Sequence, residues 1–271
     1  MRLIATPLKD DIGMEIHADI DTLLSPEVGA QLRKLLIDRG VLVFRTLNPG
    51  DEQQLALAGN IGTLRQEQGR SIYKITLDKN QNANADYLKG SWLWHLDGTH
   101  DRIPPFATML SGKVLSETGG QTEFANSYAA YETLSDEMKR RIENLKVVHS
   151  VETSMHRAGI AATDHNLSSW RSNPNTTHRL VWEHTSGRKS LVIGCHADHI
   201  VGMDRKESDA LLKELLDWAT QPRFVYRHEW TVGDLLIWDN TGVLHRAEPY
   251  PLDSGRVMHR CTLLGEEAFS H

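Results

Sequence analysis

Short apolar runs bounded by turn-forming residues recur along the chain and predict many short strands. Residues 41–47, 104–116, 234–240 and 256–265 are four such runs, each rich in β-branched, aromatic or other apolar residues and each next to Gly or Pro. Similar but weaker patterns cover the N-terminal segment and residues 146–152, 190–203 and 224–230. We expect each of these runs to form a strand.

Apolar residues three or four positions apart predict helices over residues 25–40 and 204–221, a shorter helix from residue 51 that ends near Gly59 or Gly62, and a helix that begins near Ser135. The first of these has clear end signals. Ser25 is the expected N-cap, Pro26 suits the first turn, and Gly40 marks the end.

Two polar segments show neither the apolar runs typical of strands nor the three-to-four-residue apolar spacing typical of helices. Residues 77–90 are rich in Asn, and residues 154–189 are rich in Asn, Ser, Thr and His, so we expect two long loops that serve as lids over a site. The remaining order of elements has many strands, few helices and no repeated strand–helix alternation. It predicts a mainly β fold, a sandwich or jelly roll with helices packed outside, in a single domain spanning residues 1–271.

Composition narrows the function classes. The net charge of -6 argues against a general nucleic-acid binder. Charged residues interrupt the first apolar stretch, and no run of 18 apolar residues exists, so we expect neither a signal peptide nor a membrane span. Cys195 and Cys261 form no CxxC pair, which fits a cytoplasmic protein without disulfides.

Residues 92–99, "WLWHLDGT", place a histidine and an aspartate two positions apart in an apolar segment. On a strand, His95 and Asp97 would project from the same face. Such a pair is either a hydrogen-bonded couple or two-thirds of a metal site.

A third ligand could come from His245, which follows the strand expected at 234–240. Alone it would be an ordinary loop histidine. With His95 and Asp97 it completes the 2-His-1-carboxylate set of non-haem Fe(II) oxygenases, which leaves three positions on the metal open. A chelating cosubstrate can take two of them and O₂ the third.

Two arginines lie on one face of the last expected strand. Arg256 and Arg260 are four residues apart, with Met258 between them on the same face. The planar guanidinium of an arginine grips a carboxylate through two hydrogen bonds. Either arginine alone could be a surface ion-pair partner, whereas two anionic ligands, a 2-oxoacid cosubstrate and a substrate, would explain both.

Four stretches together resemble one family: "WHLDGTH", "GGQTEFANSYAAYETLS", "WDNTGVLHRA" and "GRVMHRCTLLG". They are similar to the TauD/TfdA family of Fe(II)- and 2-oxoglutarate-dependent oxygenases, and the resemblance spans almost the whole chain. It implies a distorted double-stranded β-helix and the cofactors Fe(II), 2-oxoglutarate and O₂.

The resemblance also implies roles for individual residues. His95, Asp97 and His245 would be the metal ligands. Thr122 of "GGQT" would bind 2-oxoglutarate, and Arg256 would anchor the C5 carboxylate of that cosubstrate.

By the same resemblance, Arg260 would hold the acidic group of the substrate. Tyr73 and Ser91 are further candidate substrate residues, and Trp238 would lie near the iron. The chain departs from the usual family pattern at Leu96, between the two ligands, and at His100, shortly after them.

The string "CHADH" carries two more histidines, His196 and His199. A second metal site is disfavoured because on a strand the two would face opposite sides. The family resemblance implies that this strand borders the substrate cavity, where His196 or His199 would touch substrate.

Taken together, the sequence predicts an enzyme that hydroxylates a small anionic molecule and releases succinate and CO₂. An aryloxyalkanoate or another carboxylate or sulfonate is the expected substrate, and hydroxylation next to an ether oxygen or sulfonate would cleave it. One alternative keeps the cofactors but desaturates, cyclises or hydroxylates a natural-product intermediate. Another is a non-catalytic anion-binding jelly roll. The resemblance further implies a homo-oligomer, a dimer or tetramer.

Overall fold

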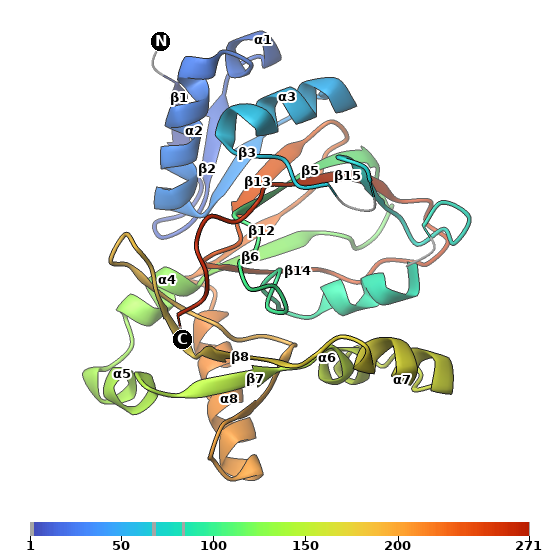
Figure 1. Cartoon of the computed structure of the whole chain (residues 1–271). Helices are drawn as coiled ribbons and strands as arrows, with labels where there is room; N and C mark the ends of the chain where they lie inside the picture. Colours follow the sequence, from blue (N-terminus) through green and yellow to red (C-terminus); the bar gives the residue numbers. More distant parts are fainter. Residues whose placement is uncertain (1–2, 67–68, 83–84, 271) are drawn as a thin grey trace.

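A computed structural model describes residues 3–66, 69–82 and 85–270 of the chain (Figure 1). Its largest sheet has seven strands, in the order β1 (Ile4–Pro7), β2 (Met14–His17), β3 (Val41–Phe44), β13 (Leu235–Asp239), β5 (Ala107–Val114), β15 (Val257–Thr262) and β4 (Tyr73–Ile75). A second sheet has three strands, in the order β12 (Val225–His228), β6 (Thr122–Asn126) and β14 (Val243–Ala247).

These two sheets face each other across a shared core. Val41 and Val43 of β3, Leu236 of β13 and Met258 of β15 belong to one buried cluster with Phe124 of β6. All five side chains are at most 1% exposed. The two β layers and the outer helices confirm the mainly β, jelly-roll prediction.

Helices cover the other face of the large sheet. They are α1 (Ile20–Leu23), α2 (Pro26–Arg39) and α3 (Asp51–Ile61). Leu42 and Phe44 alternate with the inward valines of β3 and pack in a separate cluster with Leu32 of α2 and Leu57 of α3. The period-two alternation of one strand thus supplies two cores, one on each side of the sheet.

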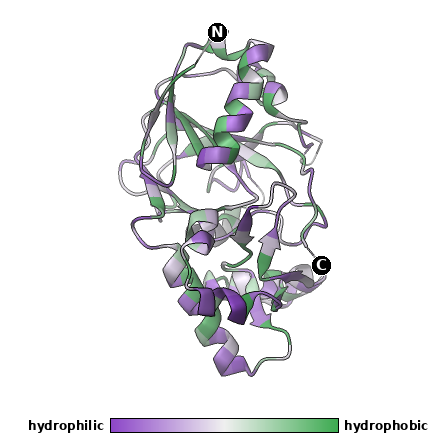
Figure 2. Ribbon diagram, turned by 90° about the vertical axis from the view of Figure 1, so that its left-hand side faces the viewer, coloured by the Kyte–Doolittle hydropathy of each residue, from purple (hydrophilic) through white to green (hydrophobic). Residues whose placement is uncertain are grey.

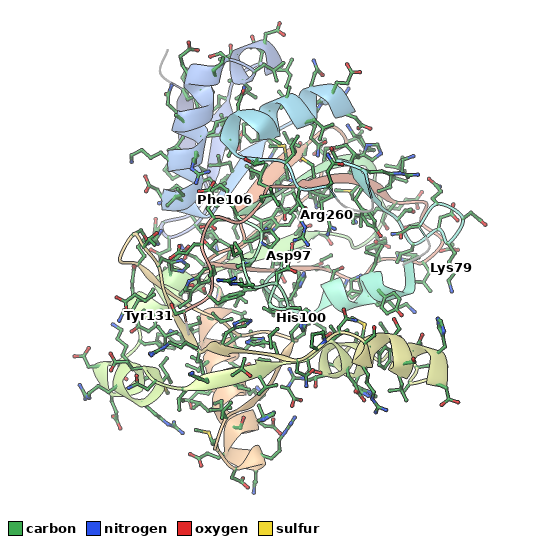
Figure 3. The ribbon with its side chains drawn as sticks, viewed as in Figure 1. Lys79, Asp97, His100, Phe106, Tyr131 and Arg260 are labelled. Atoms are coloured by element: carbon green, nitrogen blue, oxygen red, sulfur yellow. The ribbon has the colours of Figure 1, made fainter. Side chains whose placement is uncertain are left out.

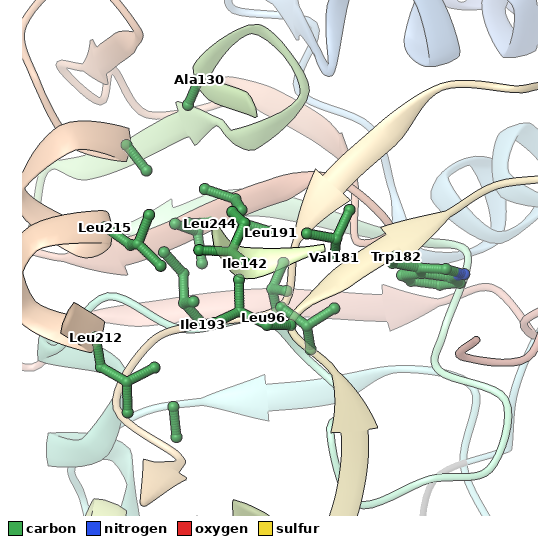
Figure 4. Close-up of a cluster of buried hydrophobic side chains, with 14 of the residues drawn as sticks. Leu96, Ala130, Ile142, Val181, Trp182, Leu191, Ile193, Leu212, Leu215 and Leu244 are labelled. Carbon is green, nitrogen blue, oxygen red and sulfur yellow. The ribbon is translucent and has the colours of Figure 1, made fainter. Parts of the chain in front are cut away.

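A further layer lies beside the small sheet (Figure 1). Its strands are β7 (Lys146–His149), β8 (Thr176–Arg179), β9 (Val181–Glu183), β10 (Lys189–Leu191) and β11 (Ala197–Ile200). Its helices are α4 (Ser127–Glu132), α5 (Asp136–Ile142), α6 (Val151–Arg157), α7 (Asp164–Arg171) and α8 (Arg205–Ala219). Figure 4 shows the buried side chains of this region, among them Trp182, Leu191 and Leu215.

The predicted helix ends agree in part. α2 begins with Pro26 after Ser25 and ends at Gly40, whose φ of 74° suits glycine. Ser25 does not cap the helix with its side chain but donates to Glu27 Oε2 at 2.8 Å.

In Figure 2 the outer helices carry both hydrophobic and hydrophilic residues, as amphipathic helices should. None of the helices in the described ranges is both long and apolar enough to span a bilayer.

The prediction of a loop over residues 154–189 was wrong. Two short helices and two strands, β8 and β9, occupy much of this segment. Ser150 caps α6 by accepting from the Thr153 N–H, and Thr163 caps α7 by accepting from the Asn166 N–H. Helices of seven and eight residues are too short to show a helical period in the sequence.

The strand predicted over residues 92–99 was also wrong. A 3₁₀ helix, η1 (Ala85–Trp92), ends where that strand should begin, and so also shortens the loop expected at 77–90. A turn with Gly98 at a φ of 77° follows Asp97. Between η1 and this turn, His95 is the one residue of the described chain that makes a β-bridge.

We expect Leu32→Ala to lower the free energy of unfolding by about 2–5 kcal/mol, because it leaves a cavity in the core beneath α2. Lys34→Ala, two residues along the same helix, removes an exposed side chain and should change that energy by less than about 0.5 kcal/mol. Urea unfolding followed by circular dichroism measures both. Equal losses for the two variants would contradict the assigned packing of α2.

Candidate active site

The site begins with a single β-bridge between residues from distant parts of the chain. The His95 N–H donates to the His245 carbonyl at 3.1 Å, and the His245 N–H donates to the His95 carbonyl at 2.9 Å. Residues that exchange both hydrogen bonds in this way carry their side chains on the same face. The two imidazole centroids are therefore only 4.1 Å apart.

Asp97 completes a compact group of ligand atoms. Its Oδ1 lies 3.7 Å from His95 Nε2, and its Oδ2 lies 3.8 Å from His245 Nε2. One ligand atom from each of the three residues falls within a 4.8 Å span, the only such group of three or more among the described residues. Figure 3 shows Asp97 near the middle of the fold with Arg260 above it.

The electrostatics favour the protonation states that bind metal. Burial raises the pKa of Asp97, but His245 and His95, in their protonated forms, together with Arg260 outweigh it and leave the pKa lowered. Burial, assisted by His95, lowers the pKa of His245 to about 3. An ionised carboxylate and a neutral imidazole are the forms that bind a metal ion.

A hydrogen bond also orients His95. Its Nδ1 lies 2.8 Å from the Leu93 carbonyl and donates to it, so Nε2 keeps its lone pair toward Asp97 and His245. Two imidazoles and one carboxylate fit Fe(II) in octahedral geometry.

A cavity of about 90 Å³ opens beside this group. Its lining combines the three residues with Ile75, Leu88, Ser91, Leu110, Thr122, Trp238, Arg246, Ala247, Tyr250, Arg256 and Arg260. The lining thus contains the predicted residues His95, Asp97, His245, Thr122, Arg256, Arg260, Ser91 and Trp238, but not Tyr73, His196 or His199. Larger grooves on the surface flank α8 and include none of the three candidate ligands.

Arg256 is a buried cation that pairs with none of the described carboxylates. It is 4% exposed, and no carboxylate is among the groups that shift its pKa. Its Nη2 donates to the Gly120 carbonyl at 3.1 Å, and its guanidinium lies 4.7 Å from the centre of the Tyr250 ring. Burial lowers the pKa of Arg256, although Tyr250 opposes the shift. A buried charge of this kind is stabilised by a bound anion.

Gly120 makes the close approach of Arg256 possible. The φ of Gly120 is 77°, and a Cβ there would lie 3.0 Å from Arg256 Nε. At Gly119 a Cβ would lie 2.0 Å from the Pro249 carbonyl oxygen. The "GG" of "GGQT" is therefore required by backbone packing, and Thr122 follows at the start of β6.

The polar side chains of the cavity wall differ in how they are held. Thr122 Oγ1 accepts from Trp230 Nε1 at 3.0 Å, and Ser91 Oγ donates to the Leu88 carbonyl at 2.6 Å. Arg260 lies over the ring of Tyr73, 5.2 Å from its centre. Tyr73 therefore supports Arg260 from outside the cavity and does not line it.

Sequence reasoning missed Tyr250, Ile75 and Leu110, because none of them belongs to a recognisable motif. It correctly expected Trp238 beside the site, where its ring centre is 4.8 Å from that of His245. Residues 154–189, expected to be a lid over the site, contribute nothing to the lining.

His196 and His199 also lie outside the cavity lining. The ring of His196 packs against that of His100, with 5.0 Å between centroids, and burial lowers the pKa of His196 to about 3. His199 Nδ1 lies 2.7 Å from Asp198 Oδ2. The two histidines thus have separate partners, as the rejection of a second metal site requires.

Known proteins are similar to this chain in sequence. A family model described as "Taurine catabolism dioxygenase TauD, TfdA family" matches residues 5–262. The alpha-ketoglutarate-dependent 2,4-dichlorophenoxyacetate dioxygenase of Burkholderia sp. (strain RASC) is 36% identical over 94% of this chain and 91% of its own length. The (S)-phenoxypropionate/alpha-ketoglutarate-dioxygenase of Sphingobium herbicidovorans is 34% identical over 88% of this chain and 86% of its own.

A solved structure extends the similarity to three dimensions. The crystal structure of AAD-2 in complex with Mn(II) and N-oxalylglycine superposes with a TM-score of 0.86 at 33% identity, covering 100% of both chains.

We expect Mn(II) to raise the thermal unfolding midpoint of the metal-free protein, because it binds the folded site and not the unfolded chain. His245→Ala should weaken Mn(II) binding by at least about 100-fold, since loss of a direct ligand exceeds the effect of losing an outer hydrogen-bond partner. His199→Ala, a histidine outside the cavity, should leave Mn(II) binding unchanged. Calorimetric titration measures the affinities, and similar values for His245→Ala and the unmodified protein would contradict the assignment.

Proposed function

Because the chain belongs to the taurine catabolism dioxygenase TauD, TfdA family, we propose that it oxidises an aryloxyalkanoate or a similar small carboxylate or sulfonate. It is an Fe(II)- and 2-oxoglutarate-dependent dioxygenase. The main support for the substrate class is one observation: two arginines, Arg256 and Arg260, share a small, largely apolar cavity with the ligand group.

His95, Asp97 and His245 are the proposed iron ligands. The orientation of His95 Nε2, the ionised state of Asp97 and the neutral state of His245 support this assignment. When bound, Fe(II) supplies O₂ activation and the oxidation of a carbon–hydrogen bond. The protein supplies the geometry and excludes competing ligands.

Arg256 is the proposed anchor for the distal carboxylate of 2-oxoglutarate. Its buried guanidinium has no carboxylate partner in the described part of the chain, and the flat fork of an arginine matches a carboxylate in two hydrogen bonds. Thr122 adds a hydroxyl on the same wall. N-oxalylglycine, bound in the related structure, has the oxo-acid and distal carboxylate groups of 2-oxoglutarate, with an N–H in place of one CH₂.

Arg260 is the proposed contact for the acidic group of the substrate. Tyr73 holds this arginine from behind, and Ser91 offers a hydroxyl nearby. Ile75, Leu88 and Leu110 provide the apolar surface that an aryl or alkyl group needs. Hydroxylation of the carbon between the acid and an ether oxygen gives a hemiacetal, which separates into a phenol or alcohol and an oxo acid.

The cavity must open to admit both ligands. Its volume of about 90 Å³ is well below the ~300 Å³ at the lower end of ligand pockets. Leu88 and Ser91 belong to η1, which follows the polar segment expected to act as a lid. Outward movement of η1 is the proposed route of entry.

Three further properties are part of the proposal. Residues 1–271 form a single domain, which is supported by site residues that come from strands throughout the chain. The protein is cytoplasmic, in keeping with two buried free cysteines. It is a dimer or tetramer, as the family resemblance suggests, and light scattering during gel filtration measures this.

Turnover with a substrate panel tests the function. We expect Fe(II), 2-oxoglutarate and O₂ to give succinate in proportion to product with aryloxyacetates and aryloxypropionates. The matching neutral amides, which keep the aryl group and lose the charge, should be poor substrates. Equal turnover of acids and amides, with no effect of charge, would contradict the role of a cationic site.

We expect Arg256→Ala to raise the KM for 2-oxoglutarate by roughly 30-fold or more, because removing a buried charge pair costs about 2–5 kcal/mol. Arg260→Ala should leave that KM within about 3-fold and raise the KM for the acidic substrate instead. Arg205→Ala, on the exposed face of α8, is the control and should change neither. If Arg260→Ala raised the KM for 2-oxoglutarate as Arg256→Ala does, the division of roles would be wrong.

A further inference from the structure

The two oxygens of Asp97 have different surroundings. Oδ1 lies 3.7 Å from His95 Nε2, whereas Oδ2 lies 3.8 Å from His245 Nε2 and also accepts a hydrogen bond from Thr108 Oγ1 at 3.4 Å. Thr108 is fully buried on β5 and does not line the cavity. Its hydrogen bond therefore draws Oδ2 toward the wall and leaves Oδ1 for the ion.

A second hydrogen bond determines which way the Thr108 hydroxyl points. Asn240 Nδ2 donates to Thr108 Oγ1 at 2.8 Å. An amide NH₂ only donates, so the single proton of the hydroxyl is free for Asp97. With the amide turned over, Thr108 would face two acceptors, the amide oxygen and the carboxylate, with one proton to give.

The backbone holds Asn240 in place for this role. It follows the last residue pair between β13 and β5, Asp239 with Ala107, and its own N–H donates to the Phe106 carbonyl at 2.9 Å. The side chain is 1% exposed, so water does not compete for the contact with Thr108. Two hydrogen bonds in series, from Asn240 to Thr108 and from Thr108 to Asp97, thus connect the end of β13 to the site.

We propose that Thr108 and Asn240 are positioning residues that keep Asp97 bound to the metal through one oxygen only. This rests on the proposed function. The consequence concerns the open positions on the metal: three protein ligands leave three, whereas a carboxylate bound through both oxygens would take a fourth. The cosubstrate needs two positions and O₂ one. The hydrogen bond from Thr108 to Asp97 Oδ2 therefore keeps all three positions on the metal open.

The binding of N-oxalylglycine to the Mn(II)-loaded protein tests the proposal without turnover. We expect Thr108→Val, which keeps the shape and loses the hydroxyl, to weaken this binding by about 10-fold or more. Thr108→Ser, which restores the hydroxyl, should stay within about 3-fold of the unmodified protein. Asn240→Asp should behave like Thr108→Val, because an acceptor of the same shape competes for the Thr108 proton.

Ser111→Ala is the matched control. Ser111 is a fully buried hydroxyl on the same strand, but it donates to Gln54 Oε1 at 2.7 Å and not toward the site. We expect this variant to lower the thermal midpoint of the metal-free protein and to leave N-oxalylglycine binding unchanged. A crystal structure of Mn(II)-loaded Thr108→Val should then show both Asp97 oxygens on the metal.

Two results would overturn the proposal. One is unchanged binding of N-oxalylglycine by Thr108→Val. The other is equal weakening by Thr108→Val and Thr108→Ser, which would implicate the methyl packing and not the hydroxyl. Failure of the unmodified protein to bind Mn(II) with N-oxalylglycine would instead overturn the function on which the proposal rests, so the two failures are distinguishable.

Discussion

The bridge between His95 and His245 is the contact on which the site depends. Two backbone hydrogen bonds attach the segment after η1 to the free edge of β14, and they bring the two imidazoles together. The opposite side of the segment is held by the Cys195 N–H, which donates to the Trp94 carbonyl at 2.8 Å. Gly194 permits this contact, since a Cβ there would lie 2.8 Å from the same oxygen. The segment is thus clamped between two parts of the fold.

The polar groups of the site are arranged for partners that the chain does not itself supply. Arg256 is buried against Tyr250 and a backbone carbonyl, without a carboxylate of its own among the described residues. Such a charge destabilises the ligand-free protein and favours binding of an anion in equal measure. The lone pair that His95 Nε2 keeps toward Asp97 and His245 is likewise available to a metal ion. These groups lower the stability of the ligand-free protein, and binding of the metal and the cosubstrate restores that stability.

Much of this could be predicted from the sequence, and the exceptions share a cause. Strands such as β13 and the helix α2 carry strong local periodicity and end signals, so their existence was clear. The candidate ligand residues could be picked out from the sequence because their types and order are rare in combination. The local structure at His95 was not, because a one-residue bridge is decided by a partner far along the chain. The supporting residues Tyr250 and Thr108 were missed for the same reason, since only tertiary contacts give them a role.

Anaerobic titration of the metal-free protein with Fe(II) and 2-oxoglutarate, followed by visible absorption, tests the site most directly. A weak charge-transfer band that needs both components, and that saturates at one equivalent of each, is the expected result. It would mean that the cosubstrate chelates iron held by His95, Asp97 and His245. Absence of the band, with neither component aiding binding of the other, would contradict the oxygenase function and leave an anion-binding jelly roll.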